Sequence, residues 1–474
     1  MVLALWAFAH ASQGADLDLH KLFHESIPDS PFIGVVYGYA DAMLEHGRDT
    51  YGPEKTGMLL SALDRKTLSP LETRPPAPAG VSCASRPGGA GKPLVGANAQ
   101  MDQNLLRLLY FLKGLSGEDR YPQAADAELK WLLTSAPSAE SGLLPWGEHL
   151  SWDVMTDTVA CGAEESLHEF SRPWMLWDRC FELAPQQSKR FALGLWNQHV
   201  VDQETGAIRP CAVFDGDSSR AATDCPRQAG FFIRTWAEAF AYTGDETFLT
   251  AIDVVLTGYE EKKRSPNVCE TLSLAIDCDG AARKVPEPLK TRLTTFAARE
   301  DAKFCALPHD LNEKNGFVKS HDATVSQISY TSLWDPTLGR QTTTAVGVMC
   351  RSRYENTGRI GYRKLIVAAA DAYLDSLPGD DIDAWPLSFG QAITLELAAW
   401  RITARKKYYA RAFELGEISI EKFFGDSPLP RASLKTDHYE STTGADTLVL
   451  ALAELHLSTR TITVVRTPAN TIDR

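Results

Sequence analysis

The pattern that most constrains the fold of this chain is a pair of helices that recurs along it. The stretches LYFLKGLSGEDRYPQAADAELKWL, EAFAYTGDETFLTAIDVVLTGYEE and AAWRITARKKYYARAFELGEISIEKF share one plan. An apolar helix ends in a turn of small or charged residues, and its partner then repeats Ala and aliphatic residues at helical spacing. Within each pair the first helix is the more uniformly apolar, so we expect it to be covered on both sides.

Helical periodicity extends over most of the chain beyond residue 100, whereas strand-like alternation is confined to RTITVVRT near the C-terminal end. The turn within each pair is short, but the connections between pairs, over residues 135–165, 202–226 and 307–341, are long. Such loops are usually functional, and a ring of hairpins would gather them on one face around a cleft. The sequence therefore predicts an all-α fold whose hairpins close into a toroid. The expected helices span residues 101–117, 119–136, 167–183, 186–201, 227–242, 246–262, 285–304, 362–377, 387–404, 406–424 and 443–457.

This organisation resembles the (α/α)6 toroid of carbohydrate-active enzymes, which include glycoside hydrolases, polysaccharide lyases and sugar epimerases. The resemblance covers residues 101–457 and rests on the hairpin pattern, on turns such as AYTGDETFL and on an aromatic-rich cleft. It implies a catalytic toroid over residues 101–460 that acts on a carbohydrate. Residues 16–100 are expected to form an N-terminal helix and a Pro/Gly-rich arm, and residues 461–474 a C-terminal tail.

The net charge of the chain limits the kinds of molecule that it is expected to bind. The formal net charge is −13 and the pI is about 5.4, whereas binding to phosphate backbones requires clustered Lys and Arg. Neither nucleic acid nor a membrane is expected as a partner, and the oligomeric state is left open. No glycine-rich nucleotide loop and no ordered set of metal ligands occurs along the chain. We therefore expect no cofactor and no bound metal.

The first residues bear on localisation. Residues 1–15, MVLALWAFAHASQGA, contain a short apolar run and an Ala-His-Ala site, as in part of a signal segment, but no preceding Lys or Arg. We expect a secreted or periplasmic protein, with a cytoplasmic one as the alternative. The nine cysteines leave the compartment open, because an odd number cannot all pair within the chain.

The stretch LLPWGEHLSWDV carries the densest chemistry. It places Glu148, His149 and Asp153 on a predicted loop between Trp146 and Trp152. Apolar flanks raise the pKa of a carboxyl group, and glycoside cleavage commonly uses two carboxyls, one of them as the acid. We predict that the three ionisable residues are catalytic and that the two rings bind sugar. The alternative is that the tryptophans merely pack the loop.

A second stretch, SLHEFSRPWMLWD, adds His168 for proton transfer near neutral pH and Arg172 as a fork for a substrate carboxylate. Other polar residues near helix ends are weaker candidates, since each also has an ordinary structural interpretation. The further predicted substrate-binding residues are Asn197, His199, Arg227, Arg234, Arg353, Tyr354, His438 and Tyr439.

Together these features predict a glycan-degrading enzyme that acts on a uronic-acid-containing poly- or oligosaccharide. Paired carboxyls favour a glycoside hydrolase. A His or Tyr base with an Arg neutraliser would instead make a polysaccharide lyase that works by β-elimination. A sugar epimerase, or a helical-repeat protein that binds without catalysis, are further alternatives.

Overall fold

The computed structural model describes residues 30–89, 91–136, 140–162, 166–216, 220–261, 267–313, 316–322, 327–459 and 467–474. The predicted signal segment at residues 1–15, and all but the last residue of the RTITVVRT stretch, lie outside this part. No helix in the described ranges is both long and apolar enough to cross a membrane.

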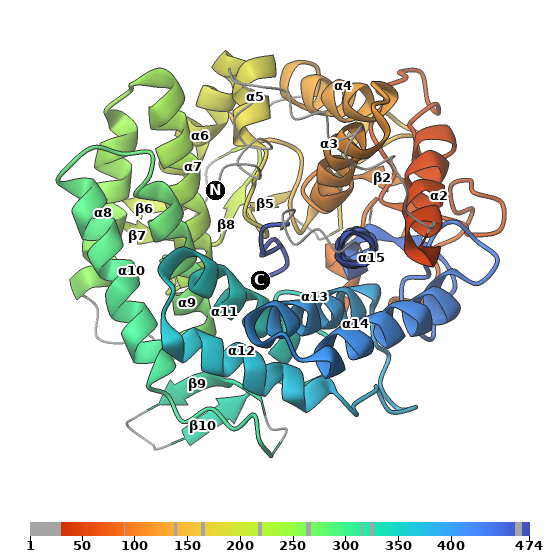
Figure 1. Ribbon diagram of the computed structural model, residues 1–474. Helices are drawn as coiled ribbons and strands as arrows, with labels where there is room; N and C mark the ends of the chain where they lie inside the picture. Colours follow the sequence, from red (N-terminus) through yellow and green to blue (C-terminus); the bar gives the residue numbers. More distant parts are fainter. Residues whose placement is uncertain are drawn as a thin grey trace.

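Helical hairpins make up most of the described chain (Figure 1). In most of the hairpins the first helix lies nearer the centre of the ring, and its partner packs outside it. Six hairpins follow one another in the described ranges: α3 (Gln103–Ser116) with α4 (Arg120–Thr134), α5 (Trp177–Leu183) with α6 (Pro185–His199), α7 (Pro226–Thr243) with α8 (Thr247–Glu261), α9 (Val268–Ala281) with α10 (Leu289–Cys305), α11 (Thr343–Thr357) with α12 (Ile360–Tyr373), and α13 (Pro386–Thr403) with α14 (Lys406–Ser419).

The ring is closed by helices from the two ends of the chain. Helix α15 (Ala445–Ser458) packs on α2 (Pro31–Glu45), and these two make a further pair beside the six. Helix α15 also contacts both α13 and α3, so the last inner helix meets the first. The predicted all-α toroid is thus confirmed, and its N-terminal helix, expected within residues 31–52, completes it.

Local sequence explains the hairpin turns. Helices α3 and α7 end where Gly117 (φ 75°) and Gly244 (φ 68°) adopt the left-handed conformation that terminates a helix at little cost for glycine. Ala404 holds the same conformation between α13 and α14, with φ at 55°. Proline in the first turn begins α6, α7 and α13, where its missing N–H would have had no helical partner.

Short antiparallel strands cross the loop-rich end, which the sequence patterns did not reveal. Residues 167–169 form strand β5 and not the beginning of the expected helix, because they pair with residues 211–213 of β8. Helices α9 and α11 were also not anticipated. The strands are β1 (Ala62–Leu63) with β11 (Tyr439–Glu440), β2 (Gly96–Ala97) with β3 (Leu150–Asp153) and β4 (Thr158–Cys161), β5 (Leu167–Glu169) with β8 (Cys211–Val213), β6 (Val200–Asp202) with β7 (Ala207–Ile208), and β9 (Val318–Asp322) with β10 (Gln327–Tyr330).

A buried carboxyl in the wall of the ring makes stability depend on pH. Glu396 of α13 is fully buried, and neither of its carboxyl oxygens has a hydrogen-bond partner in the described ranges. Burial raises its pKa to about 9. A carboxyl whose pKa is higher in the folded chain than in the unfolded chain favours folding at low pH, and this contribution is lost as the pH rises toward the folded-state value.

Replacing Glu396 with glutamine should therefore stabilise the protein in neutral and alkaline solution only. Near pH 4 the melting temperatures of the variant and the parent should agree. By about pH 8 the variant should be more stable by about 1–3 kcal/mol, because it has no proton to lose. Thermal melts at both pH values measure this, and equal melting temperatures at pH 8 would contradict it.

Candidate active site

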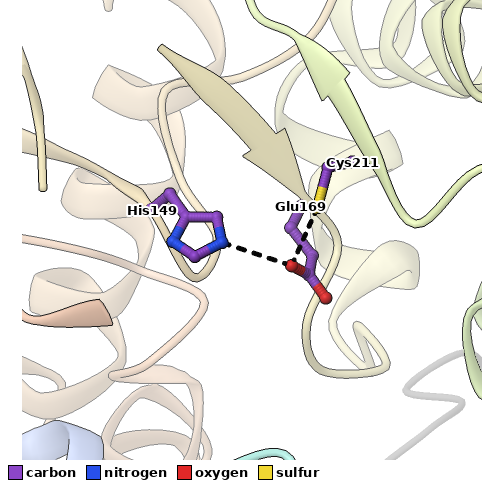
Figure 2. Close-up of side chains that lie close together, drawn as sticks. All are labelled: His149, Glu169 and Cys211. Carbon is purple, nitrogen blue, oxygen red and sulfur yellow. Dashed lines mark hydrogen bonds and ion pairs between the residues drawn. The ribbon is translucent and has the colours of Figure 1, made fainter. Parts of the chain in front are cut away.

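Three side chains that can bind a metal meet at the loop-rich end of the ring. The register of β5 and β8 sets Glu169 opposite Cys211, and the loop before β3 brings His149 beside them (Figure 2). His149 Nε2 lies 3.5 Å from Glu169 Oε2, and Cys211 Sγ donates to the same oxygen at 3.1 Å. One ligand atom from each residue lies within 4.8 Å of the other two. We call these three residues the His149 cluster.

The electrostatics of the His149 cluster are strongly coupled. Burial acts to raise the pKa of Glu169, but hydrogen bonds from His149 and Cys211, with the nearby charge of Arg227, outweigh it and hold the pKa below its ordinary value. The hydrogen bond to Glu169 raises the pKa of His149. Burial, followed by the charge of Glu169, raises the pKa of the Cys211 thiol. Glu169 is thus a carboxylate between two groups that hold protons.

The donor set fits a divalent transition metal. Imidazole nitrogen, carboxylate oxygen and thiolate sulfur are the ligands of zinc and related metals, and catalytic sites commonly use three protein ligands. The second ring nitrogen of His149, Nδ1, lies 3.4 Å from the carbonyl oxygen of Ala84, the kind of contact that orients a ligating imidazole. The expectation of no metal rested on spacing along the chain, and these ligands come from three separate segments.

Glu148 lies next to the His149 cluster and reaches a cavity. Ser85 Oγ donates to Glu148 Oε1 at 2.8 Å. Burial, and then the charge of Glu169, raise the pKa of the Glu148 carboxyl. Ser85 ends the short helix η2 (Cys83–Ser85), and the next residue, Arg86, binds Glu440 at 2.8 Å. The Pro/Gly-rich arm thereby folds back onto the ring and forms one wall of the site.

The cavity beside Glu148 has a volume of about 470 Å³, including its open mouth. Its walls carry the guanidinium groups of Arg172 and Arg227, and the C-terminal residues Asp473 and Arg474 also line it. The charge of Arg227 acts on both Glu148 and Glu169, which places the cavity and the His149 cluster in one electrostatic environment. Guanidinium groups bind carboxylates well, so the cavity suits an acidic ligand.

Of the predicted catalytic residues, Glu148 and His149 lie together, whereas Asp153 lies apart from them in a turn. Asp153 is buried in β3, and its Oδ1 accepts backbone hydrogen bonds from Met155 (2.9 Å) and Thr156 (3.1 Å). This is the bonding of a turn-forming aspartate. We therefore assign Asp153 a structural role.

The two tryptophans predicted to bind sugar are core residues. Trp146 is 1% exposed, and its ring centroid lies 4.6 Å from that of Trp174. Trp152 is 2% exposed and packs edge-on against Trp131. Neither ring offers a face to a ligand, because both rings are packed into the aromatic core beneath the loops. Packing, the alternative interpretation of these rings, is what the structure shows.

His168 and His199 form a buried pair. His168 Nδ1 and His199 Nε2 are 2.9 Å apart, and both side chains are fully buried. Burial lowers the pKa of His199 to about 4, and that of His168 also falls well below its ordinary value. His199 Nδ1 contacts the carbonyl oxygen of Arg209 at 3.1 Å. The pair therefore stays neutral and supports the strands that carry Glu169 and Cys211.

Among the predicted binding residues, Arg172 and Arg227 line the cavity. The others lie elsewhere and have other contacts: Arg234 faces Asp277 at 3.9 Å, Arg353 pairs with Asp301 at 2.7 Å, His438 contacts Glu440 at 2.8 Å, Tyr439 bonds Tyr39 at 2.9 Å, Tyr354 is partly buried against the core, and Asn197 is exposed on α6. Arg353 and His438 thus belong to buried pairs with Asp301 and Glu440, as expected if their role is structural.

Sequence reasoning left Glu169 and Cys211 out of the predicted site, although Glu169 stands in the quoted stretch SLHEF. All three residues of strand β5 are buried, so alternation of buried and exposed residues gives no signal for this strand. No local pattern links Cys211 to His149, since the two are 62 positions apart in the chain.

Part of the chain that carries this site is similar to a family of known proteins. A family model described as periplasmic pectate lyase matches residues 88–208, which include His149 and Glu169. A pectate disaccharide-lyase from Dickeya dadantii (strain 3937) is 25% identical over 174 residues, or 36% of this chain. The match spans 29% of that relative, so the chain aligns with less than a third of its length.

Solved structures agree on the fold. A D-mannose isomerase superimposes with a TM-score of 0.51 at 9% identity, over 92% of this chain and all of that one. An unsaturated glucuronyl hydrolase specific for heparin gives a TM-score of 0.43 at 9% identity, over 91% of this chain and 99% of the other. The first of these likenesses shows that the chain shares the fold of that isomerase.

Proposed function

We propose that this protein is a polysaccharide lyase that cleaves a polyuronate of the pectate type by β-elimination. The observation that carries the proposal is the His149 cluster beside an arginine-lined cavity. His149 and Glu169 of this cluster and Arg172 of the cavity lie within residues 88–208, the part of the chain that resembles periplasmic pectate lyases. Sequence analysis alone leaned toward hydrolysis and held this reaction as the alternative. We prefer elimination because Asp153, one carboxyl of the pair on which that lean rested, accepts backbone hydrogen bonds of a turn.

The proposed chemistry matches the side chains present. A base removes the proton from the carbon next to the uronate carboxylate, the bond to the leaving oxygen breaks, and a carbon–carbon double bond forms. The leaving oxygen takes up a proton and departs as a hydroxyl, so one proton is removed and one is supplied, and no water is consumed. Removal of that proton requires the negative charge on the carboxylate to be neutralised. Arg172 and Arg227 supply positive charge at the cavity wall. We assign the proton acceptor to Glu148, whose carboxyl lines the cavity and is oriented by Ser85.

A divalent metal held by His149, Glu169 and Cys211 would supply a Lewis acid for the same carboxylate. His149, Glu169 and Cys211 would hold this metal, and the carbonyl oxygen of Ala84 orients the imidazole ring of His149 through its second nitrogen, Nδ1.

A second candidate is hydrolysis of the same kind of chain. Glu148 lines the cavity and is held by Ser85, and Glu169 lies in the adjacent His149 cluster, where His149 and Cys211 hold it. A protonated and an ionised carboxyl flanking a glycosidic bond are the machinery of glycosidases. Hydrolysis by two carboxyls needs no metal, which distinguishes it from the proposed elimination reaction.

Similarity to a family described as periplasmic supports export of this protein to the periplasm or the exterior. We infer the same compartment for its activity, since polymers of this kind are met outside the cytoplasm.

A panel of polysaccharides tests the reaction class. Each polymer is incubated with the full chain, and both new reducing ends and ultraviolet absorbance are followed. Elimination from polygalacturonate should give absorbance from the unsaturated uronate in step with new reducing ends. Reducing ends without absorbance would support the hydrolase, and the absence of both on every polyuronate would overturn the proposal.

Removal of metal provides a separate prediction. Dialysis against a chelator should lower the rate on polygalacturonate by at least about tenfold, and one added divalent transition metal should restore it. Elemental analysis before and after dialysis shows whether a metal left the protein. Full activity of protein free of metal would exclude a role for the metal in the reaction.

A further inference from the structure

The end of the described chain lies inside the ring and not on its surface. In Figure 1 the C-terminal end is surrounded by the inner helices. Residues Thr471, Ile472 and Arg474 are each less than 9% exposed. Ile472, Asp473 and Arg474 line the same cavity as Glu148. The last residues therefore form part of the cavity floor.

The carboxylate of Asp473 forms an ion pair through one oxygen and accepts hydrogen bonds through the other. Arg172 Nη2 lies 2.9 Å from Asp473 Oδ1. Thr447 Oγ1 donates to the other oxygen, Oδ2, and Asn104 Nδ2 reaches Oδ2 at 3.5 Å. Arg172 is also held by the carbonyl oxygen of Met101 at 2.9 Å, so its guanidinium stays in place without Asp473. A guanidinium, a hydroxyl and an amide together make a cradle for one carboxylate.

The rest of this segment is anchored independently of Asp473. Arg474 Nη2 donates to Asp277 Oδ1 at 2.5 Å, and its Nε donates to Ser273 Oγ at 2.9 Å. Arg107 donates to the side chain of Asn470 at 2.9 Å. Because α9 and α3 hold the segment on either side of Asp473, the Asp473 side chain can leave the cradle while the side chains of Asn470 and Arg474 remain anchored.

Two further buried carboxyls lie in the region of Asp473. Asp446 and Asp102 lie in the same region, fully buried. Burial and then the charge of Asp473 raise the pKa of Asp446 to about 8. Burial raises the pKa of Asp102 to about 6. Asp473 thus stands in an acidic region, and Arg172 is the cation that binds its carboxylate there.

We propose that Arg172, Thr447 and Asn104 form a carboxylate-binding subsite that Asp473 fills in the resting protein and that an acidic sugar takes over by displacing Asp473. This inference rests on the proposed function for the identity of the sugar. The chain thus carries an internal mimic of its own substrate's charged group. Ligand affinity is lowered by the fraction of molecules in which Asp473 occupies the cradle.

The substitution Asp473→Asn tests the subsite, because it keeps the shape of the side chain and removes its charge. Binding is measured by calorimetry in a Glu169→Gln background, where turnover does not interfere, with trigalacturonate and with malonate as probes. We expect the Asp473→Asn chain to bind both probes about tenfold more tightly. Glu118→Gln, an exposed carboxylate of the α3–α4 turn, is the matched control for loss of one charge and should leave both affinities unchanged.

The outcomes separate this inference from the proposed function. Tighter binding of malonate without any gain for trigalacturonate would uphold the subsite and count against an acidic glycan as the substrate. Unchanged or weaker binding of both probes would overturn the subsite. A purely structural Asp473 would give that second result, together with a lower melting temperature.

Hydrogen exchange on the parent chain provides a test that needs no variant. Addition of trigalacturonate or malonate should speed the exchange of backbone amides in residues 471–474, since the ligand replaces the contact of Asp473 with Arg172. Unchanged or slower exchange at saturating ligand would contradict displacement.

Discussion

Replacing Glu169 with glutamine should lower kcat/KM on polygalacturonate by at least about 100-fold while the melting temperature changes little. The expected loss is large because Glu169 is the member of the His149 cluster that contacts both of the others. An amide has nearly the same shape but carries no charge, so it cannot help to hold a divalent cation and accepts hydrogen bonds from His149 and Cys211 less strongly. Steady-state kinetics and a thermal melt on the same preparation measure the two effects.

The matched control is Glu182→Gln, an exposed carboxylate of α5 that pairs with Arg179 at 2.6 Å. It should retain the parent rate. If the Glu169→Gln chain kept more than about a tenth of the parent kcat/KM, the His149 cluster would not be part of the catalytic machinery. A large fall in melting temperature would instead show that the carboxylate chiefly stabilises the loops.

The largest effect on stability is expected at Asp301, for which the substitution Asp301→Ala should cost about 3–5 kcal/mol. Asp301 of α10 is fully buried. Its two oxygens accept paired hydrogen bonds from Arg353 at 2.9 and 2.7 Å, and Tyr362 donates to Oδ1 at 2.7 Å. Removing the carboxylate leaves the guanidinium of Arg353, which is 1% exposed, without its main counter-charge.

Denaturant unfolding of parent and variant measures this cost. The matched control is Asp119→Ala, whose carboxylate pairs with Lys113 on the surface and which should change stability by less than about 1 kcal/mol. Similar small losses for both variants would mean that the Arg353 pair is not important to the ring. Arg353 was also predicted to bind substrate, and an arginine paired with Asp301 is not available to a ligand.

Much of the fold could be predicted from the sequence because its determinants are local. A helix and its neighbour are encoded within about 35 residues, as in the pair joined at Gly244, and helical spacing of apolar residues needs no long-range information. Closure of the ring by α2 and α15 follows from contacts between distant segments. The short strands were missed because three or four residues give too little alternation to recognise.

The site could be predicted only in part for the same reason. Glu148 and His149 are adjacent in the chain, and their setting between tryptophans drew attention to them, although both rings proved to be core. Glu169 and Cys211 meet through the register of two strands, which no local pattern encodes. The contact of Asp473 with Arg172 joins two segments that are far apart in the chain, so no local pattern encodes it.

The central claim is that this site breaks a uronate chain by elimination and not by hydrolysis. The most direct test is to cleave a defined trigalacturonate in water enriched in the heavy oxygen isotope and to measure the masses of the products by mass spectrometry. Elimination predicts products whose masses sum to that of the substrate, with no heavy oxygen incorporated at the moment of cleavage. Products that together exceed the substrate by one water, and that carry the heavy oxygen at the new reducing end from the earliest time point, would contradict the claim.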